Sequence, residues 1–170
     1  ASDITRTFPV NGHFSDPQKI IYEIVLAAHK AALECIKPGA VYTDMQDAAV
    51  RVIIQGLTNI GLLTGTLEAN IENQDYRKFY MHNIGHWLGM DVHDVGAYKL
   101  GGVSRPLTQG MITTVEPGIY IDPDDMTIPS QWRGIGVRIE DNILVTETGY
   151  RNLTGDLPVS VVDIERLMAS

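Results

Sequence analysis

Apolar residues in the first part of the chain recur at the spacing of one helix face. The stripe comprises Ile20, Ile21, Ile24, Val25, Ala28, Ala31, Ala32 and Cys35. The sequence SDP at residues 15–17 places a capping side chain before a proline of the first turn, and KPG at residues 37–39 ends the stripe. This pattern predicts an amphipathic helix over residues 16–35.

Three further helices are predicted. The second begins at Thr43, which stands three residues before Gln46 in the spacing of a capping box, and we expect it to end near Gly56. Its inward positions are Met45, Ala48, Ala49, Val52 and Ile53. Shorter helices are expected over residues 67–74 and 161–168.

Strand patterns replace helical ones from residue 79 onward. Residues 111–115 are rich in β-branched side chains and predict a strand that residues 119–121 continue, and residues 134–146 form the longest strand pattern. At the start of the chain, residues 4–8 alternate as an opening β segment. Because there are no repeats, low-complexity tracts or linkers, the pattern predicts one domain of the α+β class.

Composition and charge narrow the class of protein. The chain has 170 residues and a formal net charge of −8, which disfavours nucleic acid and anionic membranes as partners, since both select basic surfaces. No apolar run approaches the roughly 18 residues that span a bilayer. The single Cys35 excludes an internal disulfide, fits a cytoplasmic location, and is interpreted as a small core residue rather than a reactive thiol. The chain starts inside a β segment and without an initiator Met, so we expect a piece of a longer protein.

Histidines gather in the segment HNIGHWLGMDVHD at residues 82–94, which holds three of the five in the chain. His82 and His86 stand four apart, a spacing that suits one helix face. Gly85 and Gly89 count against a helix, because each costs about 1 kcal/mol relative to Ala in a helix interior. No Glu follows His82, so the zinc-protease motif HExxH is absent. We expect a strand or a tight loop.

Three acidic residues lie in apolar β surroundings. They are Asp3, Glu116 at the end of MITTVEP, and Glu140 inside GVRIEDNILV. Each has an ordinary explanation: Asp3 as a frayed terminus, Glu116 as a solvent-facing turn residue, and Glu140 with Arg138 as an ion pair on an exposed face; each histidine can likewise be a hydrogen-bonded core group. Together, however, the acids and histidines form an oxygen-rich donor set that suits Mn²⁺, Fe²⁺ or Co²⁺ better than a structural zinc.

Four segments in order along the chain carry a resemblance to a known family. The segments SDITRTFPVNG, FYMHNIGHWLGMDVHDVG, TTVEPGIYI and GIGVRIEDNILVTETG closely resemble those of the Xaa-Pro aminopeptidases (aminopeptidase P). These enzymes share the pita-bread fold with prolidase, creatinase and methionine aminopeptidase, and the RIEDNILVT strand is more similar to aminopeptidase P and prolidase than to methionine aminopeptidase. The resemblance implies a pita-bread α+β domain, with helices on a curved, mostly antiparallel sheet.

The resemblance also implies a metal centre of two divalent ions, usually manganese. Asp3 matches a bridging aspartate and His86 matches the histidine ligand. Glu116 and Glu140 match the two glutamates, of which the second bridges the ions. A further aspartate of the family lies just before Asp3, ahead of the first residue of this chain. Residues 1–170 are therefore expected to be the C-terminal part of the catalytic domain, to bind at most one metal well, and to be inactive alone.

Other matched positions concern the substrate. His82 and His93 match histidines that contact the substrate and the reacting carbonyl, and His93 is expected to stabilise the oxyanion. Arg138 matches an arginine that orients neighbouring carboxylates, Tyr120 is a weaker substrate-binding candidate, and Glu116 is expected to shuttle a proton. One position departs from the motif, which usually has Gly where this chain has Asn83; we expect Asn to tolerate the same turn.

The implied reaction is hydrolysis of the bond between an N-terminal residue and a following proline. The partners would be peptides with proline in the second position, and the intact enzyme is expected to be a homo-oligomer. Three alternatives stay open: a prolidase that cuts only Xaa-Pro dipeptides, a pita-bread domain that binds peptides without metal, and an unrelated soluble domain with coincidental motifs.

Overall fold

The computed structural model describes residues 1–169, with four α-helices, one 3₁₀ helix and seven short strands in that range. In chain order these are α1 (Asp16–Glu34), α2 (Tyr42–Asn59), α3 (Leu67–Asn73), η1 (Asp75–Lys78), β1 (Lys99–Leu100), β2 (Val103–Ser104), β3 (Ile112–Val115), β4 (Gly118–Tyr120), β5 (Gly136–Arg138), β6 (Asp141–Val145), β7 (Tyr150–Asn152) and α4 (Val161–Met168).

The helix starts test the capping predictions. The first is confirmed: the Ser15 hydroxyl caps α1, and the Gln18 side chain accepts a hydrogen bond from the Ser15 amide at 3.0 Å. The second is wrong by one or two residues, because α2 begins at Tyr42 and the Asp44 carboxylate accepts from the Val41 amide at 2.8 Å. The helix also runs beyond Gly56 to Asn59. The predicted ranges of the two shorter helices are confirmed to within one residue.

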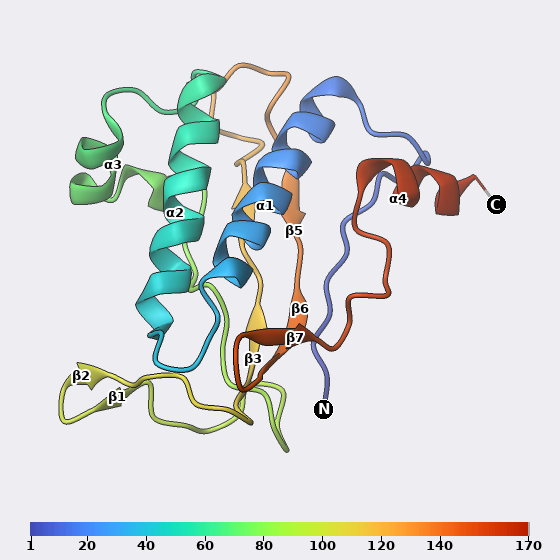
Figure 1. Ribbon diagram of the computed structural model, residues 1–170. Coiled ribbons are helices and arrows are strands. Elements are labelled where there is room, and N and C mark those ends of the chain that lie inside the picture. Colours follow the sequence, from blue (N-terminus) through green and yellow to red (C-terminus); the bar gives the residue numbers. More distant parts are fainter. Residues whose placement is uncertain (170) are drawn as a thin grey trace.

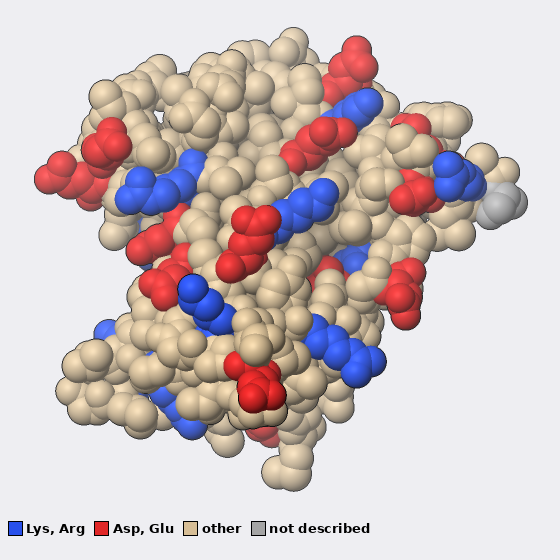
Figure 2. Space-filling view, in the orientation of Figure 1, with Lys and Arg blue, Asp and Glu red and all other residues tan. Residues whose placement is uncertain are grey.

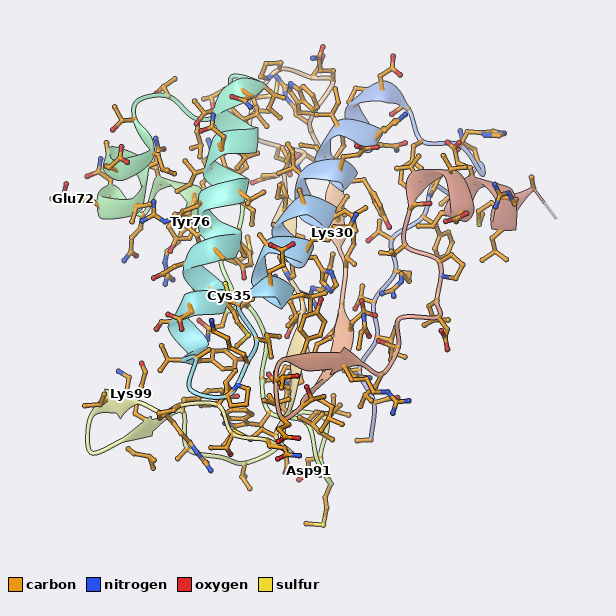
Figure 3. All side chains as sticks on the ribbon, viewed as in Figure 1. Lys30, Cys35, Glu72, Tyr76, Asp91 and Lys99 are labelled. Carbon is orange, nitrogen blue, oxygen red and sulfur yellow. The ribbon has the colours of Figure 1, made fainter. Side chains whose placement is uncertain are left out.

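Helices α1 and α2 lie side by side and antiparallel across one face of the strands (Figure 1). Their inward stripes and the facing strand residues form one hydrophobic core. Fully buried members include Ile21, Val25, Ala28, Ala32, Met45, Ala49, Ile53, Leu57, Val115, Ile119, Ile139 and Ile143. Cys35 ends α1 and is partly buried against this core (Figure 3), as expected of a small packing residue.

The strands depart from the prediction in a way that matters for function. Strands β3 and β6 pair antiparallel and β7 joins the other edge of β6, whereas β4 pairs only with β5. Neither predicted long strand is continuous, because the ladder breaks after Val115 on one side and before Asp141 on the other. Pro117 lies in the break and has no N–H to donate to a ladder. Two glutamates, Glu116 and Glu140, stand at this break.

The sequence pattern did not predict every element correctly. The hairpin of β1 and β2 was missed, and residues 4–8 form only an isolated bridge at Thr5 instead of a strand. Within the described residues, no helix is long and apolar enough to cross a membrane. Acidic and basic side chains are interspersed over the face that α1 and α2 cover (Figure 2).

Candidate metal centre

The break in the strand ladder frees the backbone of both glutamates to pair with other segments. The Glu116 amide donates to the Ile84 carbonyl at 2.7 Å, which fastens Glu116 to the histidine segment. Glu140 and Thr5 form an antiparallel bridge, with the Glu140 amide donating to the Thr5 carbonyl at 3.1 Å. Each glutamate is thereby tied to a segment that carries another predicted ligand.

The histidine segment is an irregular loop, as the glycines predicted. It lies along β3: the Thr114 amide donates to the His86 carbonyl at 2.9 Å, and the His86 amide donates to the Thr114 hydroxyl at 3.0 Å. A Cβ on Gly85 would lie 2.1 Å from the Thr114 carbonyl oxygen, so only glycine allows this approach. Asn83 does not have a positive φ, so its backbone conformation does not require glycine at this position.

The four predicted ligands converge on one point. From Nε2 of His86, the nearest carboxylate oxygens are those of Asp3 at 3.4 Å, Glu116 at 3.5 Å and Glu140 at 4.0 Å. Ligand atoms of His86, Glu116 and Glu140 all lie within 4.8 Å of one another, a grouping that can hold a metal ion.

Hydrogen bonds fix which atoms face this point. Nδ1 of His86 lies 3.0 Å from the Trp87 carbonyl, which can only accept, so Nδ1 carries the proton and the lone pair of Nε2 faces the carboxylates. The Thr5 hydroxyl donates to Oε2 of Glu140 at 2.6 Å and leaves Oε1 turned inward. Nε2 of His86 and Oε1 of Glu140 are buried and have no hydrogen-bond partner. Buried acceptors without a donor are costly, and a cation between them would satisfy both.

The charges of the cluster also favour a bound cation. Three carboxylates surround the His86 imidazole, and the Arg138 guanidinium lies 3.7 Å from Glu116. Burial, with the neighbouring Glu116 and Asp3 carboxylates, raises the pKa of Glu140 to about 7. The raised pKa shows that the site is short of positive charge, and a divalent cation would let all three carboxylates ionise.

The ordinary explanations for the acids do not hold. Glu140 is only 2% exposed, so it is not half of a surface ion pair with Arg138. The Glu116 side chain is 12% exposed and is not a solvent-facing turn residue. Asp3 is not frayed, because its amide donates to the Asn142 side chain at 3.2 Å.

The residues expected to contact substrate lie on two sides of this cluster. The His93 ring meets the His86 ring edge to face, with centroids 4.2 Å apart, and His93 is exposed. It belongs to the loop whose tip Asp91 marks in Figure 3. On the other side, Nε of Arg138 donates to the Tyr120 hydroxyl at 2.7 Å, and this hydroxyl lies 2.8 Å from Nε2 of His82.

The donors and acceptors in the hydrogen bonds of Arg138, Tyr120 and His82 can also be assigned. Nδ1 of His82 lies 2.8 Å from the Asn83 carbonyl and must be its donor, so the Tyr120 hydroxyl donates to Nε2. Burial lowers the pKa of His82, which keeps the imidazole neutral near pH 7. Arg138, Tyr120 and His82 therefore form one fixed polar wall beside the carboxylates.

Sequence reasoning missed the residues that hold these ligands in place. Thr5, Arg6 and Asp141 all contact Glu140 or its backbone neighbours, and none was singled out. In the sequence, Thr5 and Arg6 are polar positions of ITRT, and Asp141 is the second acid of RIED. Such a pattern shows that a residue is polar but does not identify the distant residue that it contacts.

Comparisons with known proteins agree with this geometry. The sequence matches metallopeptidase family M24 over residues 1–147. The Xaa-Pro aminopeptidase of Haemophilus influenzae is 54% identical over 168 residues, which cover 99% of this chain and 39% of that protein. The Xaa-Pro aminopeptidase of Escherichia coli is 47% identical over 170 residues, which cover 100% of this chain and 38% of that protein.

Solved structures give the same result for the fold. Aminopeptidase PepP of Pseudomonas aeruginosa superposes with a TM-score of 0.97 at 56% identity, covering 99% of this chain and 38% of that one. Proline aminopeptidase P II from Yersinia pestis superposes with a TM-score of 0.94 at 49% identity, covering 99% and 38%. The chain thus spans about two fifths of the length of these relatives. On this evidence the chain belongs to metallopeptidase family M24 and has the pita-bread fold of aminopeptidase P.

Proposed function

We propose that residues 1–170 are the C-terminal part of the catalytic domain of an Xaa-Pro aminopeptidase, which hydrolyses the bond between an N-terminal residue and a following proline. The observation that carries this proposal is the convergence of Asp3, Glu116 and Glu140 on the unpaired Nε2 of His86. The substrate class comes from the relatives named above, which are Xaa-Pro aminopeptidases.

The residues present fit a divalent metal ion. Asp3, His86, Glu116 and Glu140 supply three carboxylates and one imidazole around Nε2 of His86, a donor set that favours Mn²⁺ over a structural zinc. We propose that the complete enzyme holds two such ions and that this chain alone holds at most one of them well. The metal centre would supply a hydroxide nucleophile near neutral pH.

The chain's own side chains would perform the remaining tasks. We propose that the exposed ring of His93, which meets the His86 ring, would donate to the developing oxyanion and that Glu116 would carry a proton to the leaving proline nitrogen. The fixed wall of Arg138, Tyr120 and His82 would orient the peptide. A bond before proline has no amide hydrogen, so the site needs contacts from such side chains in place of a backbone hydrogen bond.

The test uses the complete enzyme and synthetic peptides. We expect an Ala-Pro-Ala tripeptide to lose its N-terminal residue in the presence of Mn²⁺, and chelation to abolish this activity until metal is restored. Ala-Ala-Ala serves as the matched control and should stay intact. Cleavage of the dipeptide Ala-Pro alone would indicate a prolidase, and binding of Ala-Pro-Ala without cleavage in excess Mn²⁺ would indicate a peptide-binding module. Either result would contradict the proposal.

Two further proposals concern the complete enzyme. We propose a homo-oligomer and a cytoplasmic location; the free Cys35 is compatible with the second. Sedimentation of the purified enzyme tests the first, and fractionation of the source cells tests the second.

A further inference from the structure

The first residues of the chain lie antiparallel to residues 138–142 but are joined to them mostly by side chains (Figure 1). The Thr7 hydroxyl accepts from the Arg138 amide at 3.1 Å and donates to the Arg138 carbonyl at 2.9 Å. The Asp3 amide binds the side chain of Asn142 at the other end. Only Thr5 and Glu140 pair through their backbones. This contact between residues 3–7 and residues 138–142, which we call the seam, has few backbone hydrogen bonds. Another interaction is therefore needed to fix the distance between the two segments.

Arg6 lies across this seam and contacts both of its sides. One guanidinium nitrogen donates to the Thr5 carbonyl at 3.0 Å and to the Glu140 carbonyl at 2.8 Å. A second donates to Oδ1 of Asp141 at 2.7 Å, and Nε donates to the Pro158 carbonyl at 3.0 Å. One side chain thus ties together the backbones of the two segments that carry Asp3 and Glu140.

Asp141 anchors this arginine from within the core. The Arg6 and Asp141 side chains are 15% and 3% exposed. The Thr154 hydroxyl donates to the same carboxylate oxygen of Asp141 at 2.6 Å, so the carboxylate is held from two directions. Burying a guanidinium and a carboxylate together costs desolvation energy that often cancels their attraction, so stability alone is a weak reason for the pair. Asp141 directly follows the predicted ligand Glu140 in the chain, so a role in positioning that ligand is another reason for the pair.

We propose that Arg6 and Asp141 are positioning residues that hold the Asp3 and Glu140 carboxylates at the separation a divalent metal ion requires. The contact of Thr5 with Oε2 of Glu140 transmits this effect, because it turns Oε1 toward His86 only while Thr5 stays in register with Glu140. The inference rests on the metal centre of the proposed function and adds to it the residues on which metal affinity depends.

The experiment measures metal affinity in the complete enzyme. Arg6→Lys keeps the charge but loses the forked donor geometry, and Asp141→Asn keeps the shape but loses the charge. We expect the Kd for Mn²⁺, measured by calorimetry on metal-free protein, to rise about tenfold or more in each variant. The absorption spectrum of bound Co²⁺ should change as well, because it reports ligand geometry directly.

A matched control separates positioning from loss of stability. Asn70 in α3 is buried like Asp141, and its side chain donates to the carbonyls of Thr64 and Thr66, away from the ligands. Asn70→Ala should lower the unfolding temperature yet leave the Kd for Mn²⁺ and the Co²⁺ spectrum unchanged. If Asn70→Ala weakens Mn²⁺ binding as much as Arg6→Lys does, the inference is wrong.

The remaining outcomes are also decisive. Folded Arg6→Lys and Asp141→Asn proteins with a Kd within about twofold of wild type would overturn the inference and leave the proposed function intact. A wild-type enzyme that binds neither ion would overturn the metal centre and the inference together. If both variants fail to fold, Thr154→Val removes the hydroxyl that donates to Asp141 and accepts from the Asn142 amide, while Thr154→Ser keeps it. An increase of about threefold or more in Kd for Thr154→Val but not for Thr154→Ser supports the inference, and an unchanged Kd in Thr154→Val refutes it.

Discussion

His29 gives the chain a pH dependence that can be worked out from its surroundings. The side chain lies in α1, is 3% exposed, and has its Nε2 3.3 Å from Oδ2 of Asp141. Burial lowers the pKa of His29 to about 4, against the attraction of Asp141 and with help from Arg6 and Lys30. The imidazole is therefore neutral in the folded chain at pH values where it is charged in the unfolded chain.

The sign and size of the effect follow from this difference. Between the pKa of about 4 in the folded chain and the ordinary value of 6.5, the unfolded state binds one more proton than the folded state. Stability is therefore lost as the pH falls through this window, by about 1.4 kcal/mol per pH unit. Over the whole window the loss amounts to roughly 3 kcal/mol, and above pH 6.5 it vanishes.

The assay compares urea unfolding of wild type and His29→Gln between pH 4 and pH 7.5. We expect the difference between their free energies of unfolding to shift against wild type by roughly 3 kcal/mol as the pH falls, because taking the difference removes the other titrating groups. The substitution His13→Gln, at an exposed histidine, is the control and should show no such shift.

A second measurement can refute the reasoning directly. The ring proton signals of His29 in NMR spectra should not titrate between pH 7 and pH 5. A midpoint near 6.5, or a free-energy difference that stays constant across the window, would mean that burial does not keep His29 neutral.

Three substitutions test the candidate metal centre in the complete enzyme. Glu116→Ala should lower kcat by roughly 10²- to 10⁴-fold, because it removes both a ligand and the proton carrier. Gly85→Ala places a Cβ 2.1 Å from the Thr114 carbonyl, so it should cost about 1–3 kcal/mol of stability and weaken Mn²⁺ binding. Tyr120→Phe removes the hydroxyl that joins His82 to Arg138 within the polar wall and should lower kcat/KM roughly tenfold.

Each of these substitutions has a control of the same residue type at a position outside the candidate metal centre. Glu147→Ala, Gly149→Ala and Tyr150→Phe alter exposed or unhindered positions, and a Cβ at Gly149 meets nothing closer than 4.0 Å. All three should leave kcat, metal affinity and kcat/KM near wild type. Wild-type turnover by Glu116→Ala, or wild-type Mn²⁺ binding by Gly85→Ala, would contradict the roles assigned to these residues. An unchanged kcat/KM in Tyr120→Phe would show that the wall does not orient substrate.

The sequence by itself determined the features that depend on near neighbours. The stripe and cap of α1, the bounds of α4 and the loop character of the histidine segment all follow from residues within a few positions of one another. The α+β class and the family also followed, because four ordered motifs carry them. Local spacing failed at the start of α2, where Asp44 and not Thr43 makes the capping contact.

Only the tertiary structure decided which groups meet and which atoms they present. Thr5 and Glu140 are 135 positions apart, and no period along the chain records their hydrogen bond. The strand break at Glu116 and Glu140 and the Arg6–Asp141 pair arise from such distant pairings. The orientation of the His86 ring is set locally by the Trp87 carbonyl, but the carboxylates that Nε2 faces come from distant segments. The physical reason is that periodicity reports which face of an element is buried, whereas a metal centre depends on distances between elements, which packing alone sets.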